Sequence, residues 1–147
     1  MRVLQPLARA TLLAGTVALT LSSCSSCEAP EEPVLPADLS GHWTGAYTLF
    51  DGTGRALTDS LLVDIKSNRG QLSGAGSRTR YLPEQEPMEG QIRVEGSVVI
   101  NTFRIEFVDP ATGNRALYSG KVDGDTLSGR LSVDGNPVGD LRMTGYR

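Results

Sequence analysis

Apolar and polar side chains alternate from residue 39 to residue 147, in short runs separated by turn-forming residues. The runs 57–65 and 92–100 show this alternation most clearly. A period of two puts successive side chains on opposite faces of a β-strand. No run of 11 residues in this region keeps the period of an amphipathic helix. The pattern therefore predicts an all-β domain.

Turn signals divide this region into eight predicted strands, because they recur about every 8 to 12 residues. Glycine, aspartate, asparagine and proline mark the turns, which we place at 51–54, 67–70, 81–88, 101, 109–114, 123–125 and 134–136. Eight strands in simple succession, each with one apolar face, favour a single small up-and-down antiparallel β-barrel, since closure removes both sheet edges. A two-sheet β-sandwich is the alternative.

The predicted inward face carries large apolar side chains and glycines. The large side chains include Trp43, Tyr47, Leu49, Ile65, Ile92, Phe103, Phe107, Tyr118 and Leu131, and the glycines lie at 45, 74, 76, 96, 120 and 129. An eight-stranded barrel is either just filled by side chains or holds one small ligand. The inward glycines leave space inside the barrel, but the aromatic side chains occupy that space. We therefore expect a filled interior.

The barrel topology separates short turns from long loops. With eight strands, the chain enters and leaves at one end, which also carries the short turns near Asn68, Asn101 and Gly124. The longer loops, 51–56, 81–88 and 109–114, then lie together at the opposite end. Binding residues concentrate on loops held by a rigid scaffold. We therefore expect any recognition surface at the long-loop end.

The segment 77–90 holds the candidate binding residues. Arg78 and Arg80 continue the inward parity of Leu72 and would reach the barrel mouth, and Tyr81 and Glu84 follow them. We interpret these four residues as a charged rim that selects a polar ligand head or a protein partner. The alternative is that the strand ends before Arg78 and that the whole segment is a solvated loop.

The start of the predicted barrel carries a recognisable motif. The segment SGHWTGAY, residues 40–47, resembles the opening of lipocalin-type and avidin-type, or calycin-like, barrels. The resemblance implies that Gly41 and Trp43 form a Gly-x-Trp motif whose tryptophan plugs one barrel end. Biotin binding does not carry over, because avidin-like sites use several tryptophans and this chain has one.

The first residues are built differently from the barrel region. Arg2 and Arg9 form a positive leader, and Thr11–Leu21 is apolar or small throughout. This run is shorter than the roughly 20 residues of a membrane span. A charged segment followed by a short apolar one is the pattern of a secretory signal peptide.

The segment LSSC, Leu21–Cys24, resembles the lipobox of bacterial lipoproteins. The resemblance implies that Cys24 receives a diacylglyceryl group and becomes the acylated first residue of the mature protein. Two or more acyl chains hold a protein stably at a membrane. Cys27 has no defined role, and a redox or zinc site at the two cysteines lacks the βαβ context or the further ligands.

We expect three parts in the chain: a lipoprotein signal peptide at 1–23, a lipidated cysteine with a Pro- and Glu-rich linker at 24–38, and the β-barrel at 39–147. The linker lacks the apolar positions to bury a hydrophobic face. Ser25 follows the lipidated cysteine, which resembles the release signal of Gram-negative lipoproteins. The expected location is the cell envelope, lipid-anchored at the outer membrane of a Gram-negative bacterium.

Charge limits the partners. The chain has 14 basic and 17 acidic residues, and removal of a leader with two arginines and no acid takes the net charge from −3 to −5. Nucleic acids and anionic lipids require a basic patch. We therefore expect no nucleic acid partner. The expected partners are the membrane, through the lipid anchor, and an envelope protein or a small apolar ligand.

The sequence offers no catalytic constellation. His42 is the single histidine, it lies on the predicted outward face, and no nucleophile elbow is present. Asp59 and Asp64 fall on opposite faces by parity, so they do not form a glycosidase pair. The segment 123–125 lacks the further ligands of an EF-hand. We expect no enzyme, no metal and no cofactor other than the covalent lipid.

These observations leave three hypotheses for function. The first is a non-enzymatic, membrane-anchored lipoprotein that binds an envelope component through its distal loops or has a structural role. The second is a carrier of a small apolar ligand inside the barrel. The third is an inhibitor that inserts the proline-stiffened segment YLPEQEP, residues 81–87, into a hydrolase.

Overall fold

All regular structure in the computed structural model, which describes residues 33–146, is antiparallel β-strand. The predicted signal peptide, Cys24 and the first part of the predicted linker lie outside the described residues. The strands are β1 Gly41–Phe50, β2 Ala56–Asn68, β3 Gln71–Tyr81, β4 Met88–Val99, β5 Thr102–Val108, β6 Arg115–Asp123, β7 Thr126–Val133 and β8 Asn136–Tyr146.

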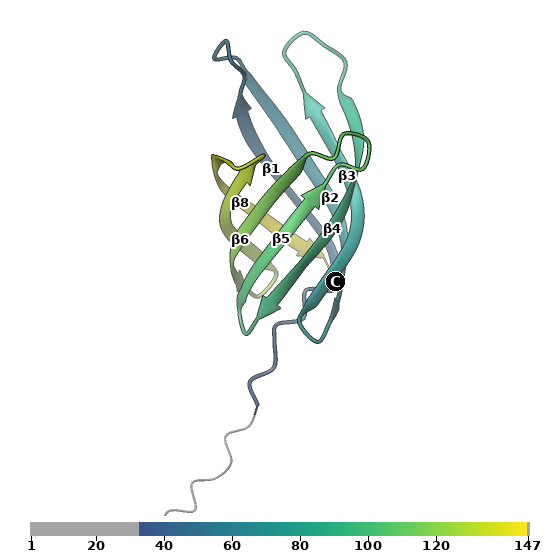
Figure 1. The fold of residues 1–147 in the computed structure, drawn as a ribbon, viewed down its shortest axis with the longest axis vertical. Helices are drawn as coiled ribbons and strands as arrows, with labels where there is room; N and C mark the ends of the chain where they lie inside the picture. The colour runs from purple at the N-terminus through teal and green to yellow at the C-terminus, as the bar shows by residue number, and fades with distance from the viewer. Residues whose placement is uncertain (1–32, 147) are drawn as a thin grey trace, which may run out of the picture. The chain divides into compact units, whose positions relative to one another are not determined.

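The strands close into one barrel in simple succession. Each strand pairs with the next one in the chain, and β1 pairs with β8 (Figure 1). The predicted eight-stranded up-and-down barrel is confirmed, and the alternative two-sheet sandwich is wrong. The architecture is consistent with a calycin-like fold.

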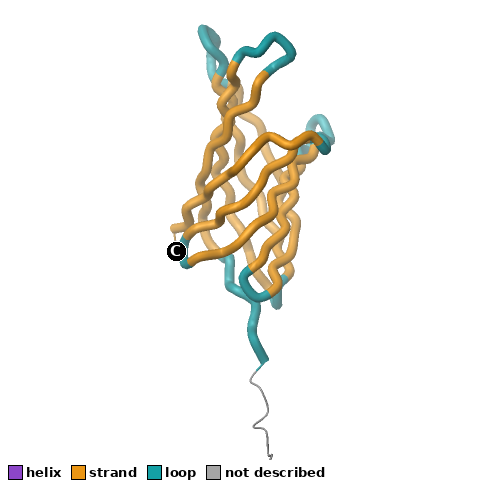
Figure 2. The backbone as a smooth tube through the Cα atoms, turned by 90° about the vertical axis from the view of Figure 1, so that its left-hand side faces the viewer, coloured by secondary structure: helices purple, strands orange, loops and turns teal. Residues whose placement is uncertain are grey.

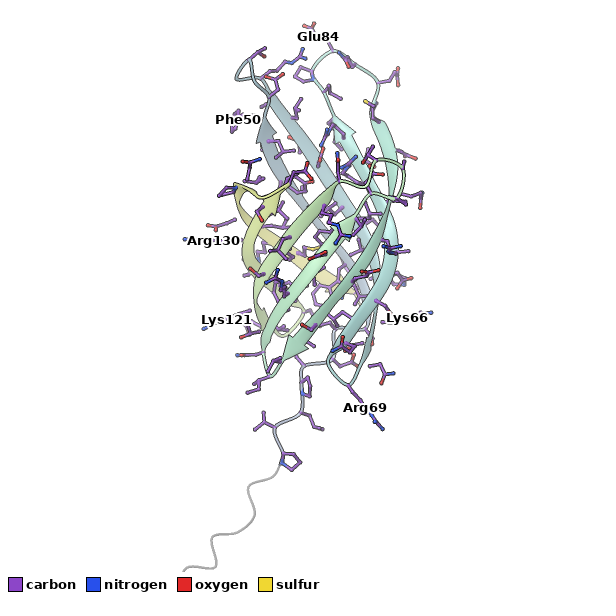
Figure 3. The ribbon with its side chains drawn as sticks, in the orientation of Figure 1. Phe50, Lys66, Arg69, Glu84, Lys121 and Arg130 are labelled. Atoms are coloured by element: carbon purple, nitrogen blue, oxygen red, sulfur yellow. The ribbon has the colours of Figure 1, made fainter. Side chains whose placement is uncertain are left out.

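The two ends of the barrel differ as the topology predicts. The Ala37 amide donates to the Ile100 carbonyl over 2.7 Å, so the chain enters beside the short β4–β5 turn. Arg69, in the β2–β3 turn, lies at this end, and Glu84 lies at the opposite end in the β3–β4 loop (Figure 3). The longer loops lie together at that opposite end (Figure 2).

The wall of the barrel is higher on one side at the loop end. The β1–β2 and β3–β4 hairpins rise above the loop that joins β5 to β6 (Figure 1). The β4–β5 ladder begins only at the pair Arg93 and Val108, so the first residues of β4 extend beyond β5. The mouth of the barrel is therefore bounded by two tall hairpins and, across from them, by lower loops.

Side chains fill the half of the barrel where the chain enters. Trp43 is buried there, and its Nε1 donates to the carbonyl of buried Leu39 over 2.8 Å. The indole also lies against Gly145, where a Cβ atom would come within 2.9 Å of the ring. Trp43 is therefore buried near the end of the barrel at which the segment before β1 enters.

Tyr118 links three strands at the centre of the core. The single hydrogen of its hydroxyl group is shared between the Leu127 carbonyl at 2.7 Å and the Leu141 carbonyl at 3.0 Å. Its ring lies 4.7 Å from that of Phe103, at a tilted angle. Burial raises the pKa of the Tyr118 phenol, so this side chain remains a neutral donor.

The β1–β2 loop is stiffened by Asp51. Its Oδ1 accepts from the Thr53 hydroxyl at 2.6 Å and from the Thr53 and Arg55 amides at 2.9 Å each. The hydrogen bond from the Thr53 hydroxyl is the main reason that the pKa of Asp51 is lowered to about 2. A side chain that replaces backbone partners in this way is the usual stabiliser of a short turn.

Candidate functional site

Three polar side chains meet on the inner face of the taller wall. Tyr47 on β1 pairs in register with Asp59 on β2, and Asp59 pairs in register with Arg80 on β3. Directly paired residues on adjacent strands project to the same face. The period of two therefore turns all three into the barrel, one layer above the apolar core.

Asp59 is the centre of this cluster and is fully buried. The guanidinium of Arg80 donates to both carboxylate oxygens over 2.7 Å each, from Nε to Oδ1 and from Nη2 to Oδ2. The Tyr47 hydroxyl donates to Oδ2 over 2.9 Å. A buried carboxylate is tolerated when such bonds and an opposite charge replace its hydration. Asp59 and Arg80 therefore meet each other's hydrogen-bonding and charge requirements.

The pKa directions agree with this geometry. The hydrogen bond to Asp59 raises the pKa of Arg80. Burial, and then the negative charge of Asp59, raise the pKa of Tyr47. Both shifts favour a charged guanidinium on Arg80 and a neutral phenol on Tyr47.

Arg78 lies beside this cluster and is less well satisfied. Its Nη2 donates to Asp109 Oδ2 at 3.3 Å, and its Nε lies 3.9 Å from Asp59 Oδ2, too far for a hydrogen bond. The Nε atom is buried and has no hydrogen-bond partner among the described residues. A buried unsatisfied donor is uncommon and calls for a missing partner, such as water, an ion or a ligand.

Asp109 is held by its own loop. Its Oδ1 accepts from the Ala111 amide at 2.9 Å and from the Thr112 amide at 3.3 Å. The hydrogen bond from the Ala111 amide is the main reason that the pKa of Asp109 is lowered. Its other oxygen accepts the long bond from Arg78. The ion pair between β3 and the β5–β6 loop thus spans the mouth with loose geometry.

A cavity of about 340 Å³ lies at this end of the barrel. Its polar lining residues are Tyr47, Arg78, Arg80, Asp109, Thr112, Asn114, Arg115 and Asp134. Its apolar lining residues are Leu49, Leu61, Ile92, Phe107, Ala116 and Val133. The predicted filled interior is therefore right for the half around Trp43 and wrong for the half at the loop end.

A second, more open hollow of about 680 Å³ shares the two arginines and Asp109 with the first. It is bounded by Met88–Gln91 of β4 and by Pro110–Thr112 of the β5–β6 loop. The Arg78–Asp109 pair thus lines both spaces. Solvent or a ligand can reach the guanidinium from either one.

The remaining charges at the rim have partners of their own. Arg115 Nη1 donates to Glu106 Oε2 over 2.9 Å, on the exposed surface. The Arg115 amide donates to Asp134 Oδ1 over 3.1 Å. Both Arg115 and Asp134 line the first cavity. Among the three arginines that line the first cavity, Arg78 has the longest side-chain hydrogen bond, at 3.3 Å.

The structure brings together two of the four predicted rim residues. Arg78 and Arg80 lie on the inner face, because β3 continues to Tyr81, so the alternative in which the strand ends before Arg78 is wrong. Tyr81 is exposed and lines neither cavity at the mouth. Glu84 is exposed in the β3–β4 loop (Figure 3) and lines neither cavity at the mouth.

Asp59, Tyr47 and Asp109 were missed as site residues. Asp59 has the same parity as Leu57 and Leu61, so an acid on an apolar face, next to a strand with inward arginines, was a readable signal. The Asp109 contact had no such signal, because it joins residues 31 positions apart across the barrel mouth.

Other predicted features lie on the outside or give no site. His42 lies on the exposed outer surface, as its parity predicts, with its Nδ1 3.4 Å from Asp64 Oδ1. Buried Asp59 lies on the opposite face of β2 from Asp64. Within residues 33–146, no group of three or more His, Cys, Asp or Glu side chains is arranged to hold a metal ion. In the same range, no helix has the length and apolar character to span a membrane.

Comparison of this chain with protein-family models, curated proteins and solved structures found no match. The geometry of the mouth offers a small cavity with apolar residues at its base and one guanidinium group, that of Arg78, whose hydrogen bonds are incomplete.

Proposed function

We propose that the protein is a lipid-anchored, non-enzymatic binding protein of the bacterial cell envelope, and that the cavity at its loop end takes up a small molecule. The observation that carries the proposal is the cavity of about 340 Å³ that Tyr47 and Arg80 of the cluster help to line. Ligand sites are mostly apolar concavities of about 300 to 1,000 Å³ with a few polar groups that fix orientation. This cavity fits that description at its lower end.

The placement of the arginines favours a small molecule over a protein partner at the loops. A rim that selects a protein would present its charges outward, whereas Arg78 and Arg80 turn into the barrel and contact buried or half-buried carboxylates. The chain also joins the barrel at the end opposite the cavity. A tether at that end leaves the mouth accessible.

The anchor part of the proposal rests on the lipobox-like segment LSSC before residue 25. An acylated Cys24 supplies the membrane attachment, and Ser25 favours the outer membrane of a Gram-negative bacterium. The barrel then works as a tethered receptor or carrier in the envelope. Tethering raises the local concentration of the binding site at that membrane.

Replacing Cys24 with serine is expected to abolish lipidation and to remove the protein from the membrane fraction, because the thiol is the acceptor of the lipid. The measurement is fractionation of a Gram-negative host that expresses the full chain, with incorporation of a labelled fatty acid. Cys27→Ser is the matched control and should label as the wild type does. Equal labelling of the Cys24 and wild-type proteins would refute the anchor.

Replacing Ala116 with phenylalanine is expected to abolish ligand uptake, because Ala116 lines the cavity and the larger ring fills it. Ser119→Phe is the matched control: the same new side chain enters the same strand but on the exposed face. The full chain is placed in lipid nanodiscs, and the probes are phenylacetate, phenylacetamide and phenethylamine, followed by ligand-detected NMR. Empty nanodiscs provide the blank.

We expect at least one probe to bind the wild type and the Ser119 variant but not the Ala116 variant. Binding that persists in the Ala116 variant would place the probe elsewhere. No binding of any probe to the wild type would refute uptake of small amphipathic molecules. Thermal unfolding of each variant verifies that both are folded.

A further inference from the structure

Asp59 and Arg80, two of the charged residues at the mouth, are paired with each other within the fold. Asp59 accepts three hydrogen bonds, two from Arg80 and one from Tyr47. Nε and Nη2 of Arg80 both donate to the Asp59 carboxylate, over 2.7 Å each, so this pair of donors is already in use. A ligand that hydrogen-bonded to Arg80 in place of Asp59 would leave a buried carboxylate without its cationic partner. Such an unpaired buried charge is energetically costly. Neither residue is free to select a ligand.

Arg78 is the other arginine on the inner face. Its side chain is 25% exposed and lines both the cavity and the adjoining hollow, and its only side-chain hydrogen bond within residues 33–146 is the 3.3 Å contact with Asp109. Its Nε is buried without a partner. Guanidinium groups bind carboxylates through two parallel N–H bonds at about 2.7 to 2.9 Å. Neither bond of that quality is made by Arg78 here.

The surroundings of Arg78 leave space for a partner. Position 90, which pairs with Arg78 across β3 and β4, is glycine, and a Cβ atom there would lie 3.7 Å from Arg78 Nη2. Asp109 is retained in its turn by the Ala111 and Thr112 amides, so it does not follow the guanidinium inward. The floor of the cavity, formed in part by buried Leu61, Ile92 and Phe107, closes it below.

We infer that Arg78 receives the carboxylate of a compact amphipathic ligand, whose short apolar body lies on the Ile92 and Phe107 floor. The inference rests on the proposed uptake of a small molecule and names its chemical class. A carboxylate supplies the acceptors that Nε and the adjacent guanidinium edge lack. The closed floor and the volume of about 340 Å³ select a short ring or chain over a long acyl tail.

The charges around the mouth favour an anion over a cation. Both inward arginines face the cavity, and the carboxylate groups beside them already accept hydrogen bonds from arginine, tyrosine or backbone donors. An ammonium group would meet the two inward guanidinium groups, and Asp109, the carboxylate beside Arg78, is already held by backbone amides of its own loop. A neutral amide would supply one acceptor and leave the second bond unmade.

The test compares three probes that share a phenyl body and differ in the head: phenylacetate, phenylacetamide and phenethylamine. Dissociation constants are measured by ligand-detected NMR with the full chain in nanodiscs. We expect phenylacetate to bind at least about tenfold more tightly than phenylacetamide, as a charge-assisted pair implies. Phenethylamine should bind most weakly of the three.

Arg78→Met is expected to remove the preference for phenylacetate while leaving the apolar part of the binding. Arg78→Lys keeps the positive charge but loses the two parallel N–H donors of the guanidinium group. This variant should therefore retain part of the preference for phenylacetate. Arg104→Met, which changes an exposed arginine on β5, is the matched control and should behave as the wild type. Thermal unfolding verifies that the Arg78 variants remain folded.

The outcomes separate the two proposals. If the three probes bind equally well, or if the Arg78→Met protein keeps the full preference, the carboxylate assignment is overturned, and cavity binding stands as long as Ala116→Phe abolishes it. If none binds the wild-type protein, the proposed uptake itself fails. If phenethylamine binds most tightly, the cavity is a cation site and the role of Arg78 is wrong.

Discussion

Replacing Asp59 with alanine is expected to lower the free energy of unfolding by about 3 kcal/mol, at the low end of the range of about 3 to 5 kcal/mol for a broken buried ion pair. The change removes the hydrogen-bond acceptor of the Arg80 guanidinium and of the Tyr47 hydroxyl, because both groups bond only to Asp59 among the contacts described above. The low end applies because Arg80 is 29% exposed and water replaces part of the lost partner.

Asp64→Ala is the matched control for this experiment. Asp64 lies on the same strand, but its side chain is on the outer face and is 64% exposed beside His42. Removal of an exposed ion-pair partner changes stability by at most about 1 kcal/mol. Urea unfolding of the three proteins, followed by tryptophan fluorescence, measures the difference. Equal midpoints for the two variants would show that the Asp59 cluster does not stabilise the fold.

Replacing Gly120 with valine is expected to cost at least about 3 kcal/mol, the upper end of the usual range for overpacking, and to disturb barrel closure. Gly120 on β6 pairs with Gly129 on β7, and a Cβ atom on Gly120 would collide with the Ser128 carbonyl and the Gly129 backbone. Backbone atoms cannot rotate away as a side chain does. The two strands would have to separate along their ladder.

Gly90→Val provides the comparison for the Gly120 variant. Gly90 is also a strand glycine with inward parity, but the nearest atom to an added Cβ is Arg78 Nη2 at 3.7 Å, an ordinary contact distance. We expect the Gly90 variant to unfold near the wild-type urea concentration and the Gly120 variant well below it. If the two unfold together, close approach of β6 and β7 is not what requires glycine at position 120.

Prediction from the sequence was most successful where the signal is local. The turn predicted at 51–54 directly follows β1, which ends at Phe50, because both the alternation and the turn signal are local to this segment. Arg78 and Arg80 were placed inward by counting from Leu72. Parity follows from strand geometry alone, so it needs no knowledge of the neighbouring strands.

The cavity was beyond the reach of the same reasoning. Parity says which side chains point inward, but not at which height along the barrel each of them lies. The register of β1, β2 and β3 sets Tyr47, Asp59 and Arg80 at one level. The shorter β5 then leaves the taller β4 unopposed above Arg93. These offsets produce a filled half and a hollow half.

The sequence by itself determined the strand order, the inward and outward faces and the end at which the long loops lie, because each follows from a period of two and from turns between neighbours. Only the tertiary structure decided that Arg80 is committed to Asp59 while Arg78 is left with a long contact to Asp109. That difference depends on strand register and on a contact across the barrel mouth, and both arise from closure of the whole sheet.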